Sequence, residues 1–119
     1  MAINKVKKRD GTIVDFDEEK IVSAIHKASQ AVRAGDREEA IELAHKVTED
    51  LERIYGEGSI PDVEDIQDIV EKVLIEEGRS TTAKAYIIYR QERRQKRREK
   101  EKLLNKDRVD TIDKRFSLK

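Results

Sequence analysis

Residues Val6–Ile21, VKKRDGTIVDFDEEKI, determine the architecture that we expect for this chain. Asp10 and Gly11 lie between two β-prone runs, and an Asp-Gly pair in that setting is the strongest short-range indication of a β-hairpin. Gly11 supplies the positive φ that the turn needs. Asp17 is then a good N-cap, and the acids that follow it favour the start of a helix. The stretch therefore predicts a hairpin that leads directly into a helix.

The two predicted strands are residues 3–8 and 12–16. Alternation along the second strand places Val14 and Phe16 on one face and Ile13 on the other. An isolated hairpin is only marginally stable in water. Helices must therefore cover the face that carries Val14 and Phe16.

Beyond the hairpin, apolar residues recur at helical spacing in four segments. The residues expected at the helix starts are Asp17, Asp36, Asp62 and Ser80, and those expected at the helix ends are Gly35 and Gly78. The buried stripes of the first three helices are expected to consist of Ile21, Ala24, Ile25, Ala28 and Val32; of Ala40, Ile41, Ala44, Val47, Leu51 and Ile54; and of Val63, Ile66, Ile69, Val70, Val73 and Leu74. The sequence thus predicts a mostly helical α+β fold, with one hairpin and four helices over residues 1–90.

The chain has no net charge, but its charges are distributed unevenly. Residues 1–89 contain 13 Lys/Arg and 20 Asp/Glu, a net charge of −7, whereas residues 90–119 contain 13 Lys/Arg and 6 Asp/Glu, a net charge of +7. A basic tail is typical either of nucleic-acid binding or of a solvated helix. In RQERRQKRREKEK, residues 90–102, acids alternate with bases and no aromatic residue is available to stack on bases. We therefore favour a solvated helix that continues past the core.

The end of the chain has a weaker pattern. Leu103 and Leu104 are expected either to fold back or to meet a partner. VDTIDKRFSLK, residues 109–119, has no clear period and is interpreted as a linker. The predicted organisation is one domain over residues 1–94, followed by a charged, basic helical extension and linker over residues 95–119.

Composition argues against several classes of protein. Without cysteine the chain has no disulfide, no thiolate zinc site and no thiol nucleophile. His26 and His45 lie on different predicted helices, so a structural role is expected for both. No serine lies in a nucleophile elbow, and no apolar run approaches the ~20 residues of a membrane span. We predict no catalytic residues, no metal-ligating residues and a soluble, cytoplasmic protein.

Cations gather at the hairpin turn. Lys8 and Arg9 precede the Asp-Gly pair, and Lys20 lies one turn into the first helix, whose free N–H groups favour an anion. These three side chains can converge on a triphosphate, although neither common glycine-rich phosphate motif is present. Lysines on an edge strand also discourage strand pairing, and residue chemistry alone favours that second interpretation. Lys7 points to the other face of its strand and is left to solvent.

The same stretch resembles the opening of the ATP-cone domain, the nucleotide-sensing module at the N-terminus of many ribonucleotide reductases. The family pattern V-x-K-R-D-G, a strand, then F-[DN]-x-x-[KR]-[IL] corresponds here to Val6, Lys8, Arg9, Asp10, Gly11, Phe16, Asp17, Lys20 and Ile21. VEDIQDIVEKVL (63–74) is similar to the family's third helix, and AKAYIIYRQER (83–93) is similar to its closing A-x-x-Y-[IL]-x-Y-R motif. The resemblance covers roughly residues 3–94.

The resemblance implies a fold in which a short N-terminal β-hairpin caps a four-helix bundle, and a site that binds ATP or dATP, with Mg²⁺ brought by the triphosphate. It assigns phosphate contacts to Lys8 and Arg9, the base or ribose side to Val6 and Phe16, and contacts from the first helix to Lys20 and Ile21. On the third helix, polar contacts map near Val63 and Gln67. Because Val63 is apolar, one of these contacts is expected to be missing.

Tyr86, Tyr89 and Arg90 match the closing motif. Two tyrosines three residues apart share a helix face. Core packing with a satisfied hydroxyl is the alternative for Tyr86, and simple solvation is the alternative for Arg90.

The function implied is a non-catalytic ATP/dATP-binding allosteric regulatory module of a ribonucleotide reductase, whose catalytic core or subunit would be its partner. It would act through a nucleotide-dependent change of assembly, as a homo-oligomer or with that partner. The chain is expected to be either an N-terminal fragment or a free-standing cone. It lacks the four-cysteine zinc ribbon of the related transcriptional repressor family. A nucleic-acid-binding or transcriptional regulator that uses the basic C-terminal helix is the alternative.

Overall fold

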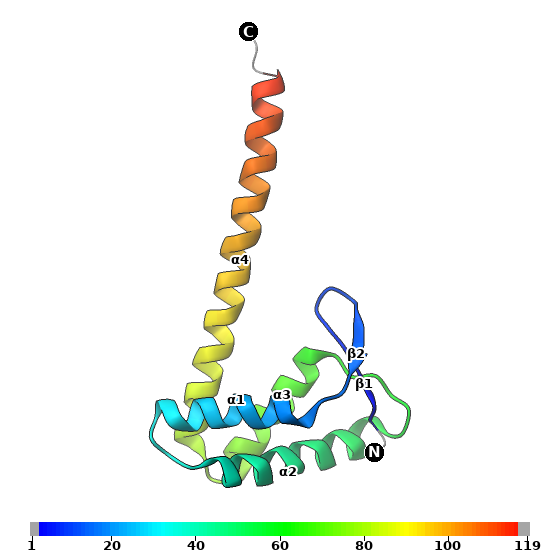
Figure 1. Ribbon diagram of the computed structural model, residues 1–119, viewed down its shortest axis with the longest axis vertical. Coiled ribbons are helices and arrows are strands. Elements are labelled where there is room, and N and C mark those ends of the chain that lie inside the picture. The colour runs from blue at the N-terminus through cyan, green and yellow to red at the C-terminus, as the bar shows by residue number, and fades with distance from the viewer. Residues whose placement is uncertain (1–2, 117–119) are drawn as a thin grey trace. The chain divides into compact units, whose positions relative to one another are not determined.

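The computed structural model describes the backbone of residues 3–116 and the side-chain environments of residues 3–104. A hairpin precedes four helices, and the elements are β1 (Lys5–Lys7), β2 (Ile13–Asp15), α1 (Glu18–Ala31), α2 (Arg37–Tyr55), α3 (Val63–Glu76) and α4 (Ser80–Phe116) (Figure 1). The predicted mostly helical α+β class is confirmed. The chain divides into two compact units, one that ends at Ile87 and one that begins at Ile88.

The hairpin follows from its turn chemistry. β1 and β2 are antiparallel, with Val6 opposite Val14. Gly11 has a φ of 88° and donates its N–H to the Lys8 carbonyl at 2.9 Å. The Lys8 N–H donates in turn to the Thr12 carbonyl at 2.8 Å. A three-residue loop with glycine in the left-handed region is a common hairpin connection, so the Asp-Gly prediction is confirmed.

The two faces of the hairpin differ as the alternation predicted. Val6 is 5% exposed, and Val14 and Phe16 pack against the core. Ile13, on the opposite face, is 53% exposed. The outer edge of β1 forms a parallel bridge between Lys7 and Asp62, the residue just before α3. The hairpin is therefore fixed to both α1, which follows it in sequence, and α3.

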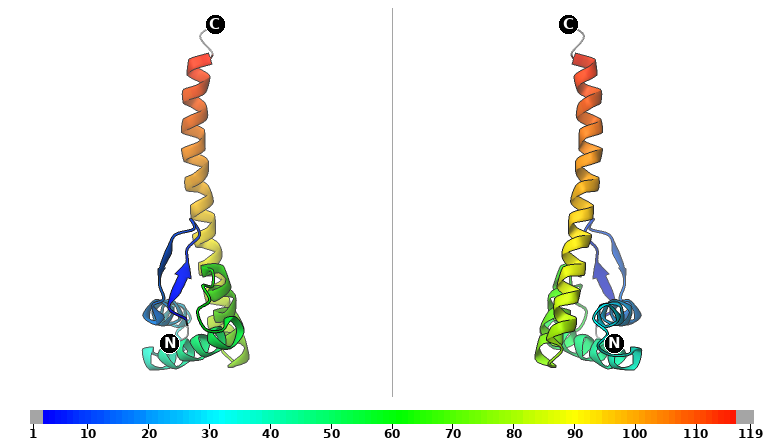
Figure 2. Two further views of the ribbon diagram at one scale, coloured as in Figure 1. Left: turned by 90° about the vertical axis from the view of Figure 1, so that its right-hand side faces the viewer. Right: turned by 90° about the vertical axis from the view of Figure 1, so that its left-hand side faces the viewer.

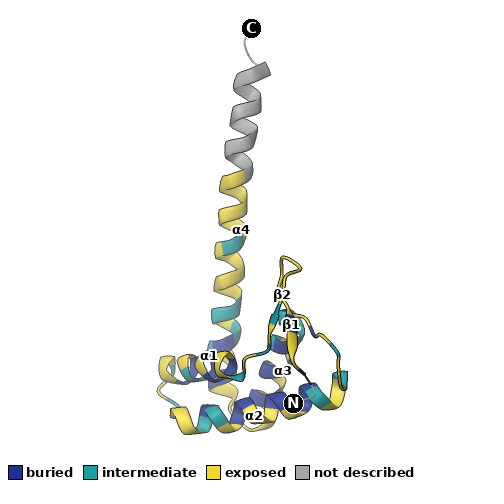
Figure 3. Cartoon of the chain, turned by 45° about the vertical axis from the view of Figure 1, so that its right-hand side comes forward, coloured by how far each residue is buried: buried dark blue, intermediate teal, exposed yellow. Residues whose placement is uncertain are grey.

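The core of the first unit lies among its helices. α1 packs on α2, and α2 packs on α3, as the three views together show (Figures 1 and 2). Figure 3 shows the buried residues concentrated on their facing sides. The fully or almost fully buried apolar side chains include Ile3, Ile25, Ala44, Val47, Leu51, Val70, Val73 and Leu74, with Ala83 from the start of α4. This packing forms the base on which the hairpin rests.

The start signals of the helices were predicted well. The Asp17 carboxylate accepts the Glu19 N–H at 3.0 Å, and the Asp36 carboxylate accepts the Glu39 N–H at 2.9 Å. Each bond satisfies one of the N–H groups that a helix leaves free at its start. Ser80 is different, because α4 already includes it as its first residue.

The end of α1 was predicted wrongly. α1 stops at Ala31, and not near Gly35, because Arg33 adopts the left-handed conformation with a φ of 53°. The Arg33 N–H donates to the Gln30 carbonyl at 3.1 Å, and the Ala34 N–H donates to the Ser29 carbonyl at 2.8 Å. This pair of bonds is a Schellman motif built on a residue other than glycine.

α3 also ends in a Schellman motif, and here the left-handed residue is a glycine, as expected. Gly78 has a φ of 77° and donates to the Ile75 carbonyl at 3.1 Å, while the Arg79 N–H reaches the Leu74 carbonyl at 2.7 Å. The prediction that Gly78 ends α3 is therefore confirmed.

The predicted stripe of α2 needs one correction. Ile54 is 51% exposed, whereas Leu43, which the prediction omitted, is 6% exposed. Tyr55, the last residue of α2, packs against the core instead of Ile54. The buried face thus lies slightly to one side of the predicted one at the C-terminal end of the helix.

The last helix is longer than expected. α4 continues to Phe116, so residues 109–116, interpreted from sequence as part of a linker, are helical. Leu103 and Leu104 are exposed, and residues 117–119 lie outside the described part of the chain. Nowhere in the described part is a helix both long enough and apolar enough to cross a membrane.

Candidate functional site

The hairpin loop holds its cations on a backbone that Asp10 stabilises. The Asp10 carboxylate accepts the Thr12 N–H at 2.9 Å, and this bond lowers the pKa of Asp10. Such a local bond from an aspartate to the backbone two residues on fixes a turn. Asp10 therefore shapes the loop that presents Lys8 and Arg9.

The first turn of α1 brings the second set of predicted residues to the hairpin. The Lys20 N–H donates to the Asp17 carbonyl at 3.1 Å, which places Lys20 in that first turn. Lys20 is exposed, while its neighbour Ile21 is 7% exposed and belongs to the core. One turn of helix thus offers a cation to solvent and an apolar side chain to the interior.

A cavity of about 230 Å³ lies between the hairpin, α1 and α3. Its lining includes eight of the residues that the sequence predicted for a ligand site: Val6, Lys8, Phe16, Lys20, Ile21, Val63, Gln67 and Tyr86. These residues come from four elements and are up to 80 positions apart in the chain. The fold therefore brings most of the predicted set to one place.

The cavity combines apolar walls with positive charge. Its lining is mainly aliphatic and aromatic, and it also includes two exposed lysines, Lys8 and Lys20. Small-molecule sites commonly have this composition, with a few polar groups that fix the orientation of the ligand. The arrangement suits a ligand with an apolar ring system and an anionic tail.

Two aspartates also line the cavity, but both already have partners. The Lys5 ammonium donates to the Asp15 carboxylate, and this hydrogen bond lowers the pKa of Asp15. The Asp17 carboxylate accepts the Glu19 N–H as the cap of α1. Lys5 therefore offsets the charge of Asp15, and Asp17 is engaged as the cap of α1.

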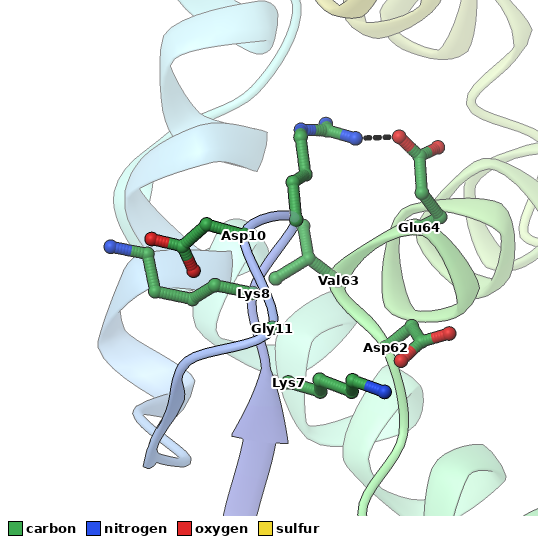
Figure 4. A pocket seen from close by; sticks show the side chains of 8 residues that line it. Lys7, Lys8, Asp10, Gly11, Asp62, Val63 and Glu64 are labelled. Carbon is green, nitrogen blue, oxygen red and sulfur yellow. Dashed lines mark ion pairs between the residues drawn. The ribbon is translucent and has the colours of Figure 1, made fainter.

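Arg9 lies outside this cavity. It lines a second, larger cavity of about 670 Å³, together with Lys7, Asp62 and Glu64 among others. Its guanidinium forms an ion pair with Glu64, which Figure 4 marks with a dashed line. Its Nη2 also donates to Gln67 Oε1 at 3.1 Å. The structure thus holds Arg9 on α3, next to the first cavity rather than in it.

Consecutive lysines of the hairpin point in different directions. In Figure 4, Lys7 extends toward Asp62, while Lys8 extends to the opposite side of the loop. Lys8 lines both cavities, whereas Lys7 lines only the larger one. Lys7 is exposed, as the strand alternation predicted.

The three residues of the closing motif are divided between the two units. Tyr86 is 4% exposed, belongs to the core of the first unit and contributes to the wall of the smaller cavity. Tyr89 and Arg90 belong to the second unit, so they are not placed with the cavity residues. Within that unit Arg93 lies over the Tyr89 ring, 5.8 Å from its centroid, and donates to the Tyr89 hydroxyl at 3.3 Å.

Sequence reasoning missed several lining residues. Val14, Ala24, Ile66 and Val70 line the smaller cavity, although their periodicity assigned them to the core. That assignment is compatible with the structure, because core residues at the edge of a bundle can also form a cavity wall. For Glu64, no local pattern in the sequence indicated a contact with the hairpin loop.

The two histidines lie apart from the cavity. His45 Nδ1 is 2.7 Å from Glu18 Oε2, so this pair joins α2 to the start of α1. His26 is half-buried on α1. Across the described residues, no group of three or more His, Asp or Glu side chains is arranged to hold a metal ion.

Comparison with known proteins gives a family match over most of the chain. A family model for the ATP cone domain matches residues 4–95. This range contains the hairpin, the first three helices and the beginning of α4. It includes every residue of the smaller cavity.

Several curated proteins are similar to the chain. A vitamin B12-dependent ribonucleoside-diphosphate reductase from Thermoplasma acidophilum is 45% identical over 113 residues, which cover 88% of this chain and 14% of that protein. The alpha subunit of a ribonucleoside-diphosphate reductase from Chlamydia pneumoniae is 34% identical, over 76% of this chain and 10% of that protein.

A third relative is an anaerobic ribonucleoside-triphosphate reductase from Haemophilus influenzae, 35% identical over 72% of this chain and 12% of that protein. The chain therefore spans between 10% and 14% of the length of these three relatives.

Proposed function

The chain belongs to the ATP-cone domain family, and on that premise we propose that it is a regulatory module that binds ATP or dATP in the cavity between the hairpin, α1 and α3. The observation that carries the proposal is the position of Lys8 and Lys20 on one apolar cavity. Cations next to apolar walls match the two halves of a nucleotide, its anionic phosphates and its flat base.

We propose that the base enters the cavity and the phosphates lie at its open side. The cavity, at about 230 Å³, is below the ~300–1,000 Å³ typical of small-molecule sites. It therefore suits part of a nucleotide better than the whole. Phe16 and Ile21 supply the apolar contacts for the base or ribose, and Val6 and Tyr86 complete the walls.

Gln67 is the natural polar group for the base. Its amide has both donor and acceptor atoms, as the edge of adenine does. Val63, one turn earlier on α3, offers no such group, so polar recognition from α3 rests on Gln67. In this proposal Tyr89 and Arg90 of the closing motif stay candidates for contact with the ligand.

We propose that the triphosphate brings its own Mg²⁺. Mg²⁺ is usually held through phosphates, waters and one or two carboxylates. The described residues lack a cluster of acids that could form a complete cage for the ion. The chain's own lysines would meet the phosphate oxygens that the metal leaves free.

Regulation follows from differential binding. A nucleotide shifts an equilibrium between two assemblies only if it binds one of them more tightly. We propose that ATP and dATP differ in this respect, that the partner is a ribonucleotide reductase core or subunit, and that this module itself carries no catalytic residues. A module that senses adenine nucleotides must meet their pool, so the proposal includes a cytoplasmic location.

Titration calorimetry combined with sedimentation tests the proposal. The chain is expected to bind ATP and dATP with dissociation constants between micromolar and low millimolar, to bind GTP more weakly, and to sediment differently with one adenine nucleotide than with the other. Absence of adenine-nucleotide binding in that range would refute the proposed function. If the chain binds nucleotide but its sedimentation does not change, the isolated chain does not change its assembly, and only that part of the proposal is refuted.

A further inference from the structure

Arg9, the arginine of the hairpin loop, is paired with an acid of the neighbouring helix α3. Arg9 forms an ion pair with Glu64, the second residue of α3, and the two side chains are only 31% and 40% exposed. The same guanidinium donates to Gln67 at 3.1 Å. Both partners lie on α3, three residues apart, so Arg9 is held along one face of that helix.

We propose that Glu64 is a specificity-determining residue that restrains the binding of nucleoside triphosphates, because it competes with the ligand for Arg9, while it leaves the binding of monophosphates almost unaffected. This inference rests on the proposed function. A guanidinium presents its N–H groups as a planar fork that fits one carboxylate or one phosphate well. A ligand that binds the Nη1 side of Arg9 must therefore displace Glu64.

The number of phosphates determines whether that displacement is favourable. Lys8 and Lys20 line the cavity and are available to the phosphate nearest the nucleoside. Arg9 follows Lys8 directly but lines the other cavity, so a longer anionic chain is needed to reach it. A triphosphate has both the reach and the additional negative charge, while a monophosphate leaves the pair between Arg9 and Glu64 intact.

The same exchange links the phosphates to the base. Gln67 lines the smaller cavity, but its Oε1 atom accepts from Arg9. When a triphosphate takes Arg9 from α3, it also frees this oxygen for the ligand. Recognition of the base through Gln67 is therefore expected to improve when the third phosphate is present.

A double-mutant cycle on the 119-residue chain tests the role of Glu64. Affinities for ATP and AMP are measured by calorimetry in the wild type, Glu64→Gln, Arg9→Ala and the double variant. Glu64→Gln should tighten ATP binding about two- to fivefold, the range expected for removing a partly exposed ion pair, and should change AMP binding less than about twofold. In the Arg9→Ala background the gain for ATP should disappear.

Controls separate this effect from loss of charge and from loss of structure. Asp68→Asn removes one acid from the next turn of α3, outside both cavities, and should leave the preference for ATP unchanged. Glu64→Asp retains an acid at the start of the helix, where it is favourable, but shortens the side chain. If Glu64→Gln fails to fold, Glu64→Asp takes its place in the cycle. We expect this variant to give a smaller gain in ATP affinity than Glu64→Gln would.

Three results would overturn the inference: unchanged or weaker ATP binding in Glu64→Gln, a gain that persists in the Arg9→Ala background, or an equal gain for AMP. In each of these cases the wild type still binds ATP, so the proposed function survives. A wild-type chain that binds no adenine nucleotide would overturn both.

Discussion

The backbone N–H of Lys7 donates a hydrogen bond to the carbonyl oxygen of Pro61 at 3.0 Å, and it thereby joins β1 to the segment that leads into α3. Pro61 is buried, so this bond is sheltered from solvent. It fixes the hairpin against α3 and creates the space that Val6 and Val63 line. The Lys7 side chain takes no part in the bond, which makes Lys7 suitable for a control substitution.

Lys20→Ala is expected to weaken ATP binding by about 1.5–3 kcal/mol, the contribution of a charge-assisted contact. Adenosine, which lacks phosphates, should bind the variant almost as well as the wild type. Calorimetry at a fixed salt concentration measures both affinities, since screening reduces contacts between exposed charges.

Lys27→Ala is the matched control for this prediction. Lys27 lies two turns later on α1 and outside both cavities, so its loss removes the same charge from the same helix. ATP binding reduced equally by both substitutions would mean that Lys20 acts only through the overall charge of the domain.

Much of the hairpin and helix framework was predictable because its determinants are local. Asp10 and Gly11 specify the turn through bonds between neighbouring residues, and Asp17 specifies the start of α1 in the same way. Gly78 was recognised because glycine is the usual left-handed residue at a helix end. Arg33 was not, because nothing in the local sequence favours arginine in that conformation.

The cavity was predictable only in part. The family resemblance located Lys8 and Lys20, but the pair between Arg9 and Glu64 joins residues 55 positions apart and depends on how the hairpin rests on α3. Periodicity identified Ile66 as buried without indicating that it faces a cavity. Such features arise from tertiary packing, which a local pattern does not encode.

The end of α1 offers a prediction about stability. Arg33→Gly should stabilise the chain by about 0.5–1 kcal/mol, because glycine adopts a left-handed conformation that costs other residues roughly 1–2 kcal/mol, and part of that gain is lost to the greater freedom of glycine in the unfolded chain. Denaturation by urea with circular dichroism measures the change.

Gly35→Ala provides the opposite case. Gly35 has a φ of 116°, and a Cβ atom there would lie 2.9 Å from Glu39 Oε1. We expect this substitution to destabilise the chain. If Arg33→Gly proved destabilising instead, the account of how α1 ends would be incorrect.

The hairpin turn should lose stability in acid. Because the Thr12 N–H lowers the pKa of Asp10 below its ordinary value of 3.8, the ionised carboxylate is favoured in the folded state. Its contribution is present above the unfolded pKa and is lost as the pH falls through the lower, folded pKa. NMR titration of the Asp10 carboxyl should place its midpoint below 3.8.

Asp10→Asn tests the same turn by substitution. The asparagine side-chain oxygen can still accept the Thr12 N–H, so the turn should persist. The part of the pH dependence of stability that comes from the residue 10 carboxyl should disappear. A midpoint at or above 3.8 in the wild type would contradict the assigned hydrogen bond.

The most direct test of a phosphate site at the smaller cavity compares two adjacent lysines. Lys7 and Lys8 carry the same charge on consecutive residues, but only Lys8 lines the cavity that Lys20 shares. The ATP dissociation constant is measured by calorimetry for Lys8→Ala and Lys7→Ala under identical conditions. We predict a loss of about 10- to 100-fold for Lys8→Ala and less than about twofold for Lys7→Ala. Equal losses, or wild-type affinity in Lys8→Ala, would contradict the proposed site.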